Sequence, residues 1–223
     1  MKEMLSQFYS NFNSSQGKYN FAHHLGSKIK YFPAQIGENK RVLDLGCRDG
    51  VVTKTFAAGN TLTCLDVDRQ ACRLCGASLE AEIIWHDLNE PLPLPNENYD
   101  VVVLSDVLEH VFLVEPLIAE IRRVLKTGGI FLGSTPNAYY WTNRLKMARG
   151  LDLAEYTDAT HVHHFSLASL KKLLASSFQD VEITPYGKNV FLRSWPTLLA
   201  NDFFWKAVKN DSGEKNENNL LDG

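Results

Sequence analysis

Short apolar runs that are typical of buried strands alternate along the chain with segments whose apolar residues recur at helical spacing. The runs begin at Val42, Leu62, Ile83, Val101 and Ile130. The run from Val101 to Leu104 is apolar throughout, which is typical of a strand buried on both faces of a sheet. Between the last two runs, residues 116–126 show a helical period. This alternation predicts an α/β fold with a doubly wound, mostly parallel sheet that helices cover on both sides.

The regions outside this central pattern predict a cap, an insertion and a tail around a single domain of residues 37–208. Two apolar stripes predict two helices in an N-terminal cap of residues 1–36. Residues 137–160 are rich in aromatic and charged side chains without a clear period. We expect them to form a partly helical insertion over the carboxyl edge of the sheet, within a region of residues 137–165 that ends before the next helix. Residues 209–223 are dominated by polar and charged side chains and are expected to be disordered.

Local signals predict where the later elements begin and end. Gly128 is expected to be the left-handed cap that ends the helix of residues 116–126. Ser166 is expected to cap a helix that runs to Ser177. Two short strands, near residues 181–184 and 190–193, would then bring the sheet to seven strands.

The segment from Val42 to Gly50 carries the strongest chemical signal. Asp44 lies inside the apolar run, Gly46 and Gly50 bracket a tight turn, and residues 51–58 are expected to form the helix that follows. A strand that leads through a glycine-bounded turn into a helix brings the backbone close to a nucleotide-like ligand. A Cβ at either glycine would push that ligand away or exclude the required backbone angles.

The turn resembles a motif of a known enzyme family. Residues 44–50, with the sequence D-L-G-C-R-D-G, resemble motif I (D/E-x-G-x-G-x-G) of the class I S-adenosylmethionine (SAM)-dependent methyltransferases, with Arg48 in place of the middle glycine. Acidic residues end the second and third runs at Asp66 and Asp87, and residues 99–111 are similar to the family's fourth strand and the turn after it. The chain is most similar to the branch that methylates quinones, lipids and glycan precursors (methyltransferase type 11, ubiquinone-biosynthesis-like).

This resemblance implies a Rossmann-like sheet of seven strands and SAM as the cofactor. In related enzymes an N-terminal segment caps the cofactor and shapes the acceptor pocket, although the cap of this chain could equally cover only the edge of the sheet. The resemblance also implies that Asp66 accepts hydrogen bonds from both ribose hydroxyls and that Asp87 contacts the adenine amino group. The expected cofactor contacts are Asp44, Gly46, Cys47, Arg48, Gly50, Asp66, Val67, Asp87, Leu88 and Ser105.

Asp44 has a physical reason to bind a charged ligand. A carboxylate inside a buried strand is costly unless it meets hydrogen-bond donors or a positive charge. The ammonium group of the cofactor's methionine moiety, reached directly or through water, is a suitable partner, and so are the amides of the turn.

Histidines near the expected position of the methyl group are the candidate catalytic residues. A hydroxyl acceptor would benefit from a base that removes its proton. The candidate bases are His110, just past the fourth run, and His161, His163 and His164 beyond the insertion. We take His110, His161 and His164 as the catalytic set, with His110 foremost. The alternative is that His110 bonds a loop and the later group forms a structural turn, and Asp106 and Glu109 either face the ligand too or only stabilise a helix start.

Composition and charge narrow the class of acceptor. The 223 residues carry a formal net charge of −3 and no run rich in Lys or Arg, whereas a nucleic-acid acceptor calls for a basic face. We therefore expect a small-molecule acceptor. No apolar run is long enough to span a bilayer, and residues 1–3 are polar, so we expect a cytoplasmic protein without a signal peptide. The oligomeric state is not indicated. Phe203, Phe204 and Trp205 could touch a membrane or a partner, but we expect them to pack against the body of the protein.

The four cysteines raise the question of a metal site. Cys72 and Cys75 form a C-x-x-C pair, but a zinc site usually needs a second pair or suitably spaced histidines. Residues at i and i+3 share one face of a helix, so we expect these two thiols to be reduced core residues. No metal is predicted.

The resemblance implies a SAM-dependent methyltransferase, and we expect it to transfer a methyl group to a small-molecule acceptor, at oxygen, by in-line displacement. The cofactor brings an activated methyl group, so the protein has mainly to position the acceptor and exclude water. One alternative is a non-catalytic SAM-binding protein that serves as a regulator or partner, which Arg48 in the turn makes plausible. A nicotinamide-dependent oxidoreductase is a weaker alternative, because the glycine spacing does not match G-x-G-x-x-G.

Overall fold

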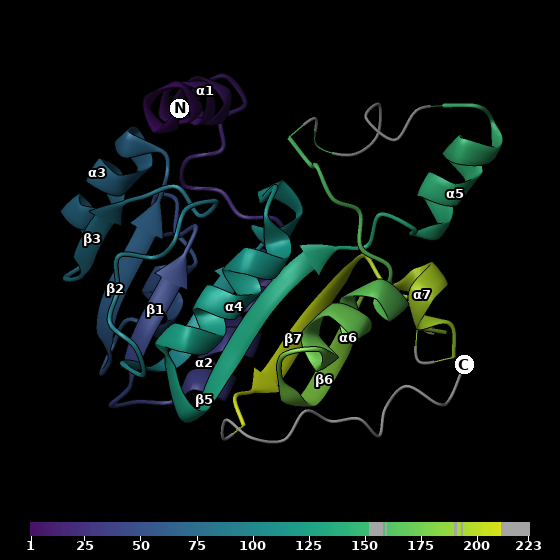
Figure 1. The fold of residues 1–223 in the computed structure, drawn as a ribbon. Coiled ribbons are helices and arrows are strands. Elements are labelled where there is room, and N and C mark those ends of the chain that lie inside the picture. Colours follow the sequence, from purple (N-terminus) through teal and green to yellow (C-terminus); the bar gives the residue numbers. More distant parts are fainter. Residues whose placement is uncertain (152–157, 159, 190, 193, 211–223) are drawn as a thin grey trace.

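The computed structural model describes residues 1–151, 158, 160–189, 191–192 and 194–210 (Figure 1). Within these residues the strands form one seven-stranded sheet in the order β3-β2-β1-β4-β5-β7-β6. The strands are β1 (Arg41–Leu45), β2 (Thr61–Asp66), β3 (Glu82–Trp85), β4 (Tyr99–Ser105), β5 (Leu125–Pro136), β6 (Gln179–Tyr186) and β7 (Asp202–Val208). Only β7 runs antiparallel to its neighbours, β5 and β6. The predicted Rossmann-like, mostly parallel α/β sheet is confirmed.

Helices cover both faces of this sheet, with α4 and α6 in front and α2 behind in Figure 1. The α-helices are α1 (Lys2–Ser15), α2 (Leu25–Ile36), α3 (Arg69–Ser78), α4 (Val114–Val124), α5 (Trp141–Ala148), α6 (Leu167–Ala175) and α7 (Pro196–Leu199), and the 3-10 turns are η1 (Thr53–Phe56) and η2 (Leu108–His110).

Alternate strand residues belong to two separate apolar cores, because successive side chains of a strand point to opposite faces. On β4, Val102 and Leu104 lie in the core beneath α4 and α6, whereas Val101 and Val103 lie in the core that α2 and α3 share. The continuous apolar run in β4 is therefore buried on both sides, as predicted.

The segment after the glycine turn is shorter than expected. The predicted helix of residues 51–58 is a single 3-10 turn, η1. Four of its eight residues are Val or Thr, whose branched Cβ disfavours a helix, and Gly59 adopts φ +74°, which ends it. The prediction of a full helix here was wrong.

The junction of α4 and β5 also differs from the prediction. The helix ends at Val124, and Leu125 is already paired with Tyr99 in the sheet. Gly128 does adopt φ +72°, but it lies within an irregular part of β5 and donates its N–H to the carbonyl of Lys209. The fully buried Leu125 takes the chain into the sheet before Gly128 is reached, so Gly128 is not the helix cap. The cap at the start of α6 is confirmed: Ser166 and Ser169 form a reciprocal capping box.

Our prediction of where the last strand lies was wrong. We predicted it near residues 190–193, of which 190 and 193 lie outside the described residues and 191 and 192 are in turns. The strand is instead β7, and it contains Phe203, Phe204 and Trp205, all fully or almost fully buried. The expectation that these aromatic residues pack against the body is confirmed. Phe203 and Trp205 lie in one apolar core and Phe204 in the other, so β7 is buried on both faces here and lacks the alternation that marks a half-buried strand.

The ends of the predicted segments are resolved in part. Lys209, which we assigned to a disordered tail, is buried and bonded to the backbone of Gly129, so that assignment was wrong for this residue. Residues 211–223 lie outside the described residues. In the predicted insertion α5 is a helix, while residues 152–157 and 159 lie outside the described residues. No helix in the described part of the chain has the length and hydropathy needed to cross a bilayer.

Candidate functional site

A cavity of about 910 Å³ opens at the carboxyl ends of the parallel strands. The N-terminal segment closes one side of it and residues beyond α5 close the other. All but one of the predicted site residues line this cavity: Asp44, Gly46, Cys47, Arg48, Asp66, Val67, Asp87, Leu88, Ser105, His110, His161 and His164. Gly50 is absent from the lining, and a Cβ there would meet Leu79 and Cys75, so Gly50 serves the packing of the turn on α3.

Gly46 sets the conformation of the first turn, after β1. Gly46 has φ +76°, and its N–H donates to the carbonyl of Leu65 over 2.7 Å. An added Cβ on Gly46 would lie 2.3 Å from a methyl carbon of Val107. Val107 fills the space that a side chain would need, so this position of the turn requires glycine.

Arg48 keeps the backbone form that a glycine would adopt. Its φ is +47°, in the left-handed region, and its N–H donates to Asp66 Oδ2 over 2.7 Å. The guanidinium group turns away toward the cap, where it donates to the carbonyl of Phe21 and lies beside Asp49. The departure from the family motif therefore leaves the turn intact and adds a link to the N-terminal segment.

Asp44 is buried in β1 with its carboxylate at the floor of the cavity. Thr53 on η1 donates its hydroxyl to Asp44 Oδ2 over 2.6 Å. Burial raises the pKa of Asp44 to about 7, although the Thr53 hydrogen bond opposes the shift. A carboxylate in this state gains most from a positively charged ligand.

Asp66 and Asp87 stand at the next two strand ends. The two oxygens of Asp66 accept the N–H groups of Arg48 and Asp68, which fix the carboxylate facing the cavity. Burial raises the pKa of Asp66 to about 6, against the effect of these two hydrogen bonds. Asp87 lies just beyond β3 and accepts hydrogen bonds from the backbone and side-chain amides of Asn89.

The N-terminal cap is bound to this edge by a residue that the sequence analysis did not single out. Asp68 is fully buried, caps α3 and accepts hydrogen bonds from the side chains of Ser10, Asn13 and Tyr19. Its place two residues after Asp66, before a helical segment, was a capping signal that could have been used. The cap therefore lines the cavity with Tyr9 and Phe12 as well as covering the edge of the sheet.

A second buried contact joins the cap to the end of β4. Lys28 of α2 is only 2 % exposed and forms an ion pair with Asp106, which also accepts a hydrogen bond from Ser134 over 2.6 Å. Burial by itself would raise the pKa of Asp106, but the charge of Lys28 and the hydrogen bonds hold it below its ordinary value.

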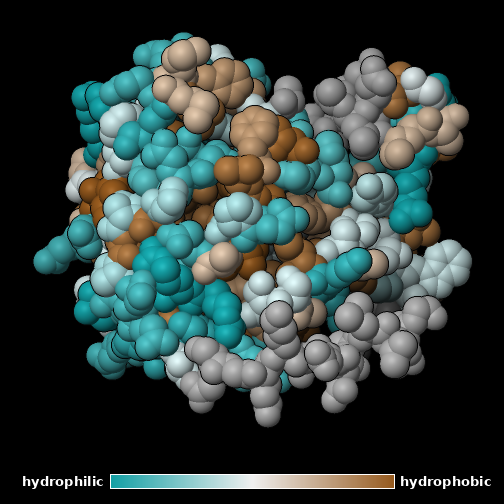
Figure 2. Space-filling model, viewed as in Figure 1, coloured by the Kyte–Doolittle hydropathy of each residue, from teal (hydrophilic) through white to brown (hydrophobic). Residues whose placement is uncertain are grey.

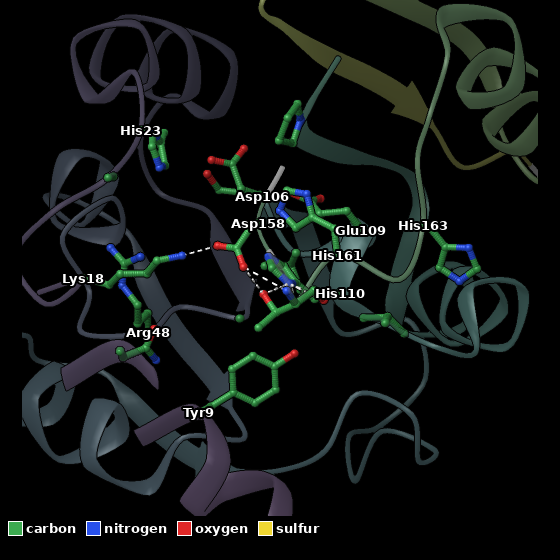
Figure 3. A pocket seen from close by; sticks show the side chains of 18 of the residues that line it. Tyr9, Lys18, His23, Arg48, Asp106, Glu109, His110, Asp158, His161 and His163 are labelled. Carbon is green, nitrogen blue, oxygen red and sulfur yellow. Dashed lines mark hydrogen bonds and ion pairs between the residues drawn. The ribbon is translucent and has the colours of Figure 1, made fainter. Parts of the chain in front are cut away.

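The far end of the cavity collects polar side chains from three distant parts of the chain (Figure 3). Tyr9 points into it from α1, His110 and Glu109 come from η2, and His161 comes from beyond the insertion. The rings of His110 and His161 have centroids 4.7 Å apart. Two of the three histidines of the predicted catalytic set are thus neighbours.

Two residues near these histidines hold them in place and were absent from the prediction. Thr160 contacts His110 Nδ1 through its carbonyl and its hydroxyl, at 3.1 and 2.9 Å. Asp158 accepts hydrogen bonds from Thr160 and forms an ion pair with Lys18 of the N-terminal segment. No local pattern marks such contacts, because the partners are far apart in the sequence.

Burial dominates the titration of this group. It lowers the pKa of His110, and burial together with the charge of His110 lowers the pKa of His161 to about 4. Burial and the charge of Asp106 raise the pKa of Glu109 well above its ordinary value. Both imidazoles are therefore neutral near pH 7.

The remaining histidines of the group differ from one another. His164 lines the cavity, and within the described part of the chain its buried Nε2 atom has no hydrogen-bond partner. His163 stands apart from His110 and His161, with its Nε2 atom 3.4 Å from the carbonyl of Phe112 (Figure 3).

The cysteines lie in the core beside the cofactor turn. Cys72 and Cys75 are both buried on α3, as expected. The sulfur atoms of Cys47, Cys64 and Cys75 all lie within 4.8 Å of one another. Cys75 therefore groups with Cys47 and Cys64 and not with Cys72.

Comparison with known proteins identifies the family. Residues 14–177 match the family model described as a methyltransferase domain. A probable S-adenosylmethionine-dependent methyltransferase of Mycolicibacterium smegmatis is 32% identical over 144 residues, which are 64% of this chain and 53% of that protein. A ubiquinone biosynthesis O-methyltransferase of Hydrogenovibrio crunogenus is 31% identical over 118 residues, 50% of this chain and 48% of that protein. The chain spans about half the length of these curated relatives.

Solved structures share the fold. A possible histamine N-methyltransferase from Thermotoga maritima has a TM-score of 0.70 at 14% identity, covering 92% of this chain and 99% of its own. A SAM-dependent methyltransferase from Archaeoglobus fulgidus has a TM-score of 0.66 at 19% identity, covering 91% of this chain and 100% of its own. Identities this low show the fold alone.

The residues of the cavity fit the cofactor of this family. Gly46 lines the cavity with backbone alone, the carboxylates of Asp44, Asp66 and Asp87 line the same cavity, and the burial of Asp44 favours a cationic partner. Asp44 would hold the ammonium group, Asp66 the ribose and Asp87 the adenine. The chain belongs to the class I SAM-dependent methyltransferases, and SAM is its cofactor.

Proposed function

We propose that the chain transfers the methyl group of SAM to an oxygen atom of a small-molecule acceptor bound beside Tyr9, His110 and His161. The observation that carries this proposal is the continuity of the cavity, which joins the carboxylates that suit the cofactor to a separate group of polar side chains. Its volume of about 910 Å³ falls near the upper end of small-molecule sites, which span roughly 300–1,000 Å³. There is room for a second ligand beside the cofactor.

The residues at the cofactor end and at the far end of the cavity have different roles in this reaction. When bound, the cofactor supplies a methyl group that its sulfonium has already activated. The cap residues Tyr9 and Phe12 cover the cavity and exclude water, and the far-end side chains orient the acceptor.

Oxygen is the proposed methylated atom because proton acceptors lie at the far end. Thr160 contacts the Nδ1 atom of His110, so the Nε2 atom is the one left to meet a ligand. Glu109 Oε1 is a second acceptor atom in the same place. The relative from Hydrogenovibrio crunogenus is named as an O-methyltransferase, which supports the same choice.

The mouth of the cavity favours an acceptor with an apolar part. Phe112 lines the cavity and is 62 % exposed, and Leu113 beside it is 48 % exposed. Both precede α4, and Figure 2 shows apolar side chains gathered in the upper centre of the molecule, near the top of that helix. An exposed apolar group at a pocket mouth suits an aromatic or aliphatic ligand.

The test is a screen of metabolite extracts with SAM that carries ¹³C in its methyl group. We expect one product whose ¹³C chemical shift is that of an O-methyl group, and a rate that falls in the His110→Ala and His161→Ala variants. A label on nitrogen or carbon would refute the choice of oxygen, and unchanged rates in both variants would refute the role of the histidines. No labelled product from a protein that binds S-adenosylhomocysteine would favour the non-catalytic alternative.

A further inference from the structure

We propose that Glu109, His110 and His161 form a binding site for one divalent transition-metal ion at the acceptor end of the cavity. One ligand atom from each of these residues lies within 4.8 Å of the other two. No sequence pattern predicts this site, because the two histidines are 51 residues apart and no spacing motif links them.

Glu109 supplies the first reason for this site. Its Oε2 atom accepts a hydrogen bond from Thr135 over 3.0 Å, which fixes the carboxylate. Its Oε1 atom has no hydrogen-bond partner among the described residues, although the side chain is only 2 % exposed. That oxygen lies 4.0 Å from His161 Nε2 and therefore faces the proposed site. A buried carboxylate oxygen without a donor is costly, and a bound cation removes the cost.

His110 is held as metal ligands commonly are. A metal-binding histidine usually uses its second ring nitrogen to bond a carbonyl or carboxylate, which sets the orientation of the ring. His110 Nδ1 lies 3.1 Å from the Thr160 carbonyl, so its N–H can donate there while Nε2 faces the cavity.

The backbone brings His161 to Glu109. The N–H groups of Val162 and His163 both donate to the carbonyl of Glu109, over 2.8 and 3.0 Å. These bonds tie the segment beyond the insertion to η2 and place the third ligand beside the first two. The arrangement is therefore maintained by contacts outside the proposed ligand set.

The donor set indicates the class of ion. Two imidazoles and one carboxylate suit Zn²⁺, Co²⁺, Mn²⁺ or Fe²⁺ better than Mg²⁺, which prefers oxygen ligands. Ligand atoms bound to one Zn²⁺ at roughly 2.0–2.2 Å lie about 3–3.5 Å apart. Side-chain rotations that move the ligand atoms by about an ångström would bring them to this separation. Three protein ligands leave at least one position open, as in catalytic zinc sites.

The open position on the metal could bind the acceptor. This second step rests on the proposed function, whereas the metal site itself does not depend on it. An acceptor hydroxyl or a pair of adjacent oxygens would take that position. Coordination to a divalent cation lowers the pKa of a bound hydroxyl, so its proton would pass to water before the oxygen is methylated. With Nε2 on the metal, His110 would then serve as a ligand in place of a base. The chemical class of acceptor is then one with a metal-binding oxygen beside its apolar part.

The test measures metal binding in the full chain without SAM and without acceptor. We expect the wild-type protein to bind one Co²⁺ per chain, with visible absorption bands of a protein-bound ion, and Zn²⁺ to displace it. The variants Glu109→Gln, His110→Ala and His161→Ala should each weaken Co²⁺ binding at least about tenfold, in line with the loss of one ligand. The matched control is His163→Ala, which removes a histidine two residues from His161 that stands outside the site and should leave Co²⁺ affinity unchanged.

Titration with S-adenosylhomocysteine shows that each variant is folded, because the donor end lies outside the proposed site. Should Glu109→Gln lose this affinity, the two histidine variants still decide the outcome. Absence of stoichiometric Co²⁺ binding by the wild type, or equal loss in His163→Ala, would overturn the proposal. Intact metal binding without methyl transfer to any acceptor would leave the metal site standing and count against the proposed function.

Discussion

The two ends of the cavity are built from the chain in different ways. At the donor end, Asp44, Asp66 and Asp87 follow one another at the ends of adjacent strands, and backbone N–H groups hold Asp66 in place. At the acceptor end, Tyr9, His110 and His161 come from the cap, from η2 and from beyond the insertion. Side-chain contacts such as the Lys18–Asp158 ion pair join these parts. The donor end depends on the geometry of the sheet, whereas the acceptor end depends on segments that could change without changing the sheet.

This difference predicts that changes at the donor end reduce cofactor affinity without an acceptor present, and the largest effect is expected for Gly46→Ala. The new Cβ would lie 2.3 Å from Val107 Cγ2 at a residue with φ +76°. We expect the affinity for S-adenosylhomocysteine, measured by calorimetric titration, to fall by more than about 100-fold, which corresponds to about 2.7 kcal/mol.

Gly37→Ala is the matched control for this change. Gly37 has φ +72°, but nothing lies within 4 Å of its added Cβ. An added Cβ strains the positive-φ backbone at both positions, but it clashes with a neighbouring side chain only at Gly46. The cofactor affinity of Gly37→Ala should therefore match that of the wild type. If Gly46→Ala kept its affinity within threefold, the turn would not be the place where the cofactor approaches the backbone.

A smaller effect with a distinct pH dependence is expected for Asp44→Asn. The wild-type carboxyl has its pKa raised to about 7, so it becomes charged as the pH rises through that value and then attracts the cofactor's ammonium group. We expect the affinity for S-adenosylhomocysteine to increase between pH 6 and 8 in the wild type, to increase less in Asp44→Asn, and to differ at least about tenfold at pH 8.

The same titration has the opposite effect on the stability of the cofactor-free protein. The folded pKa of Asp44 lies above the value of roughly 3.9 for an unfolded chain, so the folded state holds the proton more tightly. This contribution to the free energy of unfolding is present below about pH 4 and is lost as the pH rises to about 7. Denaturant titrations of the wild type and Asp44→Asn would measure it, and parallel pH curves for the two proteins would exclude Asp44 as the titrating group.

The donor end could be read from the sequence because each part of it has a local signal. The apolar runs gave the strands, the acids at their ends gave the carboxylates, and Gly46 with Gly50 gave the turn. Even there, two details differed: β-branched residues reduced the predicted helix to η1, and β7, which is buried on both faces, had no alternating pattern.

The acceptor end could be predicted only as a set of candidate residues. His110 and His161 were named, but nothing local indicated that Thr160 would hold His110 or that Glu109 would face His161. These contacts depend on how the segment beyond α5 returns to η2, and the backbone bonds from Val162 and His163 to Glu109 that fix this return join residues about 50 positions apart. Long-range pairing of this kind leaves no periodic signal in the sequence.

The smallest expected effect concerns Arg48, which joins the two ends. Its backbone N–H holds Asp66, while its guanidinium holds the carbonyl of Phe21 in the cap. Arg48→Gly restores the usual family motif and keeps the hydrogen bond from the backbone N–H to Asp66. Glycine also adopts φ +47° without strain. We expect the affinity for S-adenosylhomocysteine to fall by no more than about fivefold, chiefly through faster dissociation in stopped-flow experiments, because a partly exposed contact contributes roughly 1 kcal/mol or less.

Arg48→Ala separates the side chain from the backbone in this experiment. It loses the same contact with Phe21 but keeps a Cβ in the left-handed conformation, as in the wild type. Equal dissociation rates in the two variants would assign the effect to the link with the cap. A loss of affinity beyond tenfold in both would mean that the cap, and with it part of the acceptor end, is needed to hold the cofactor, and the division between the two ends would fail.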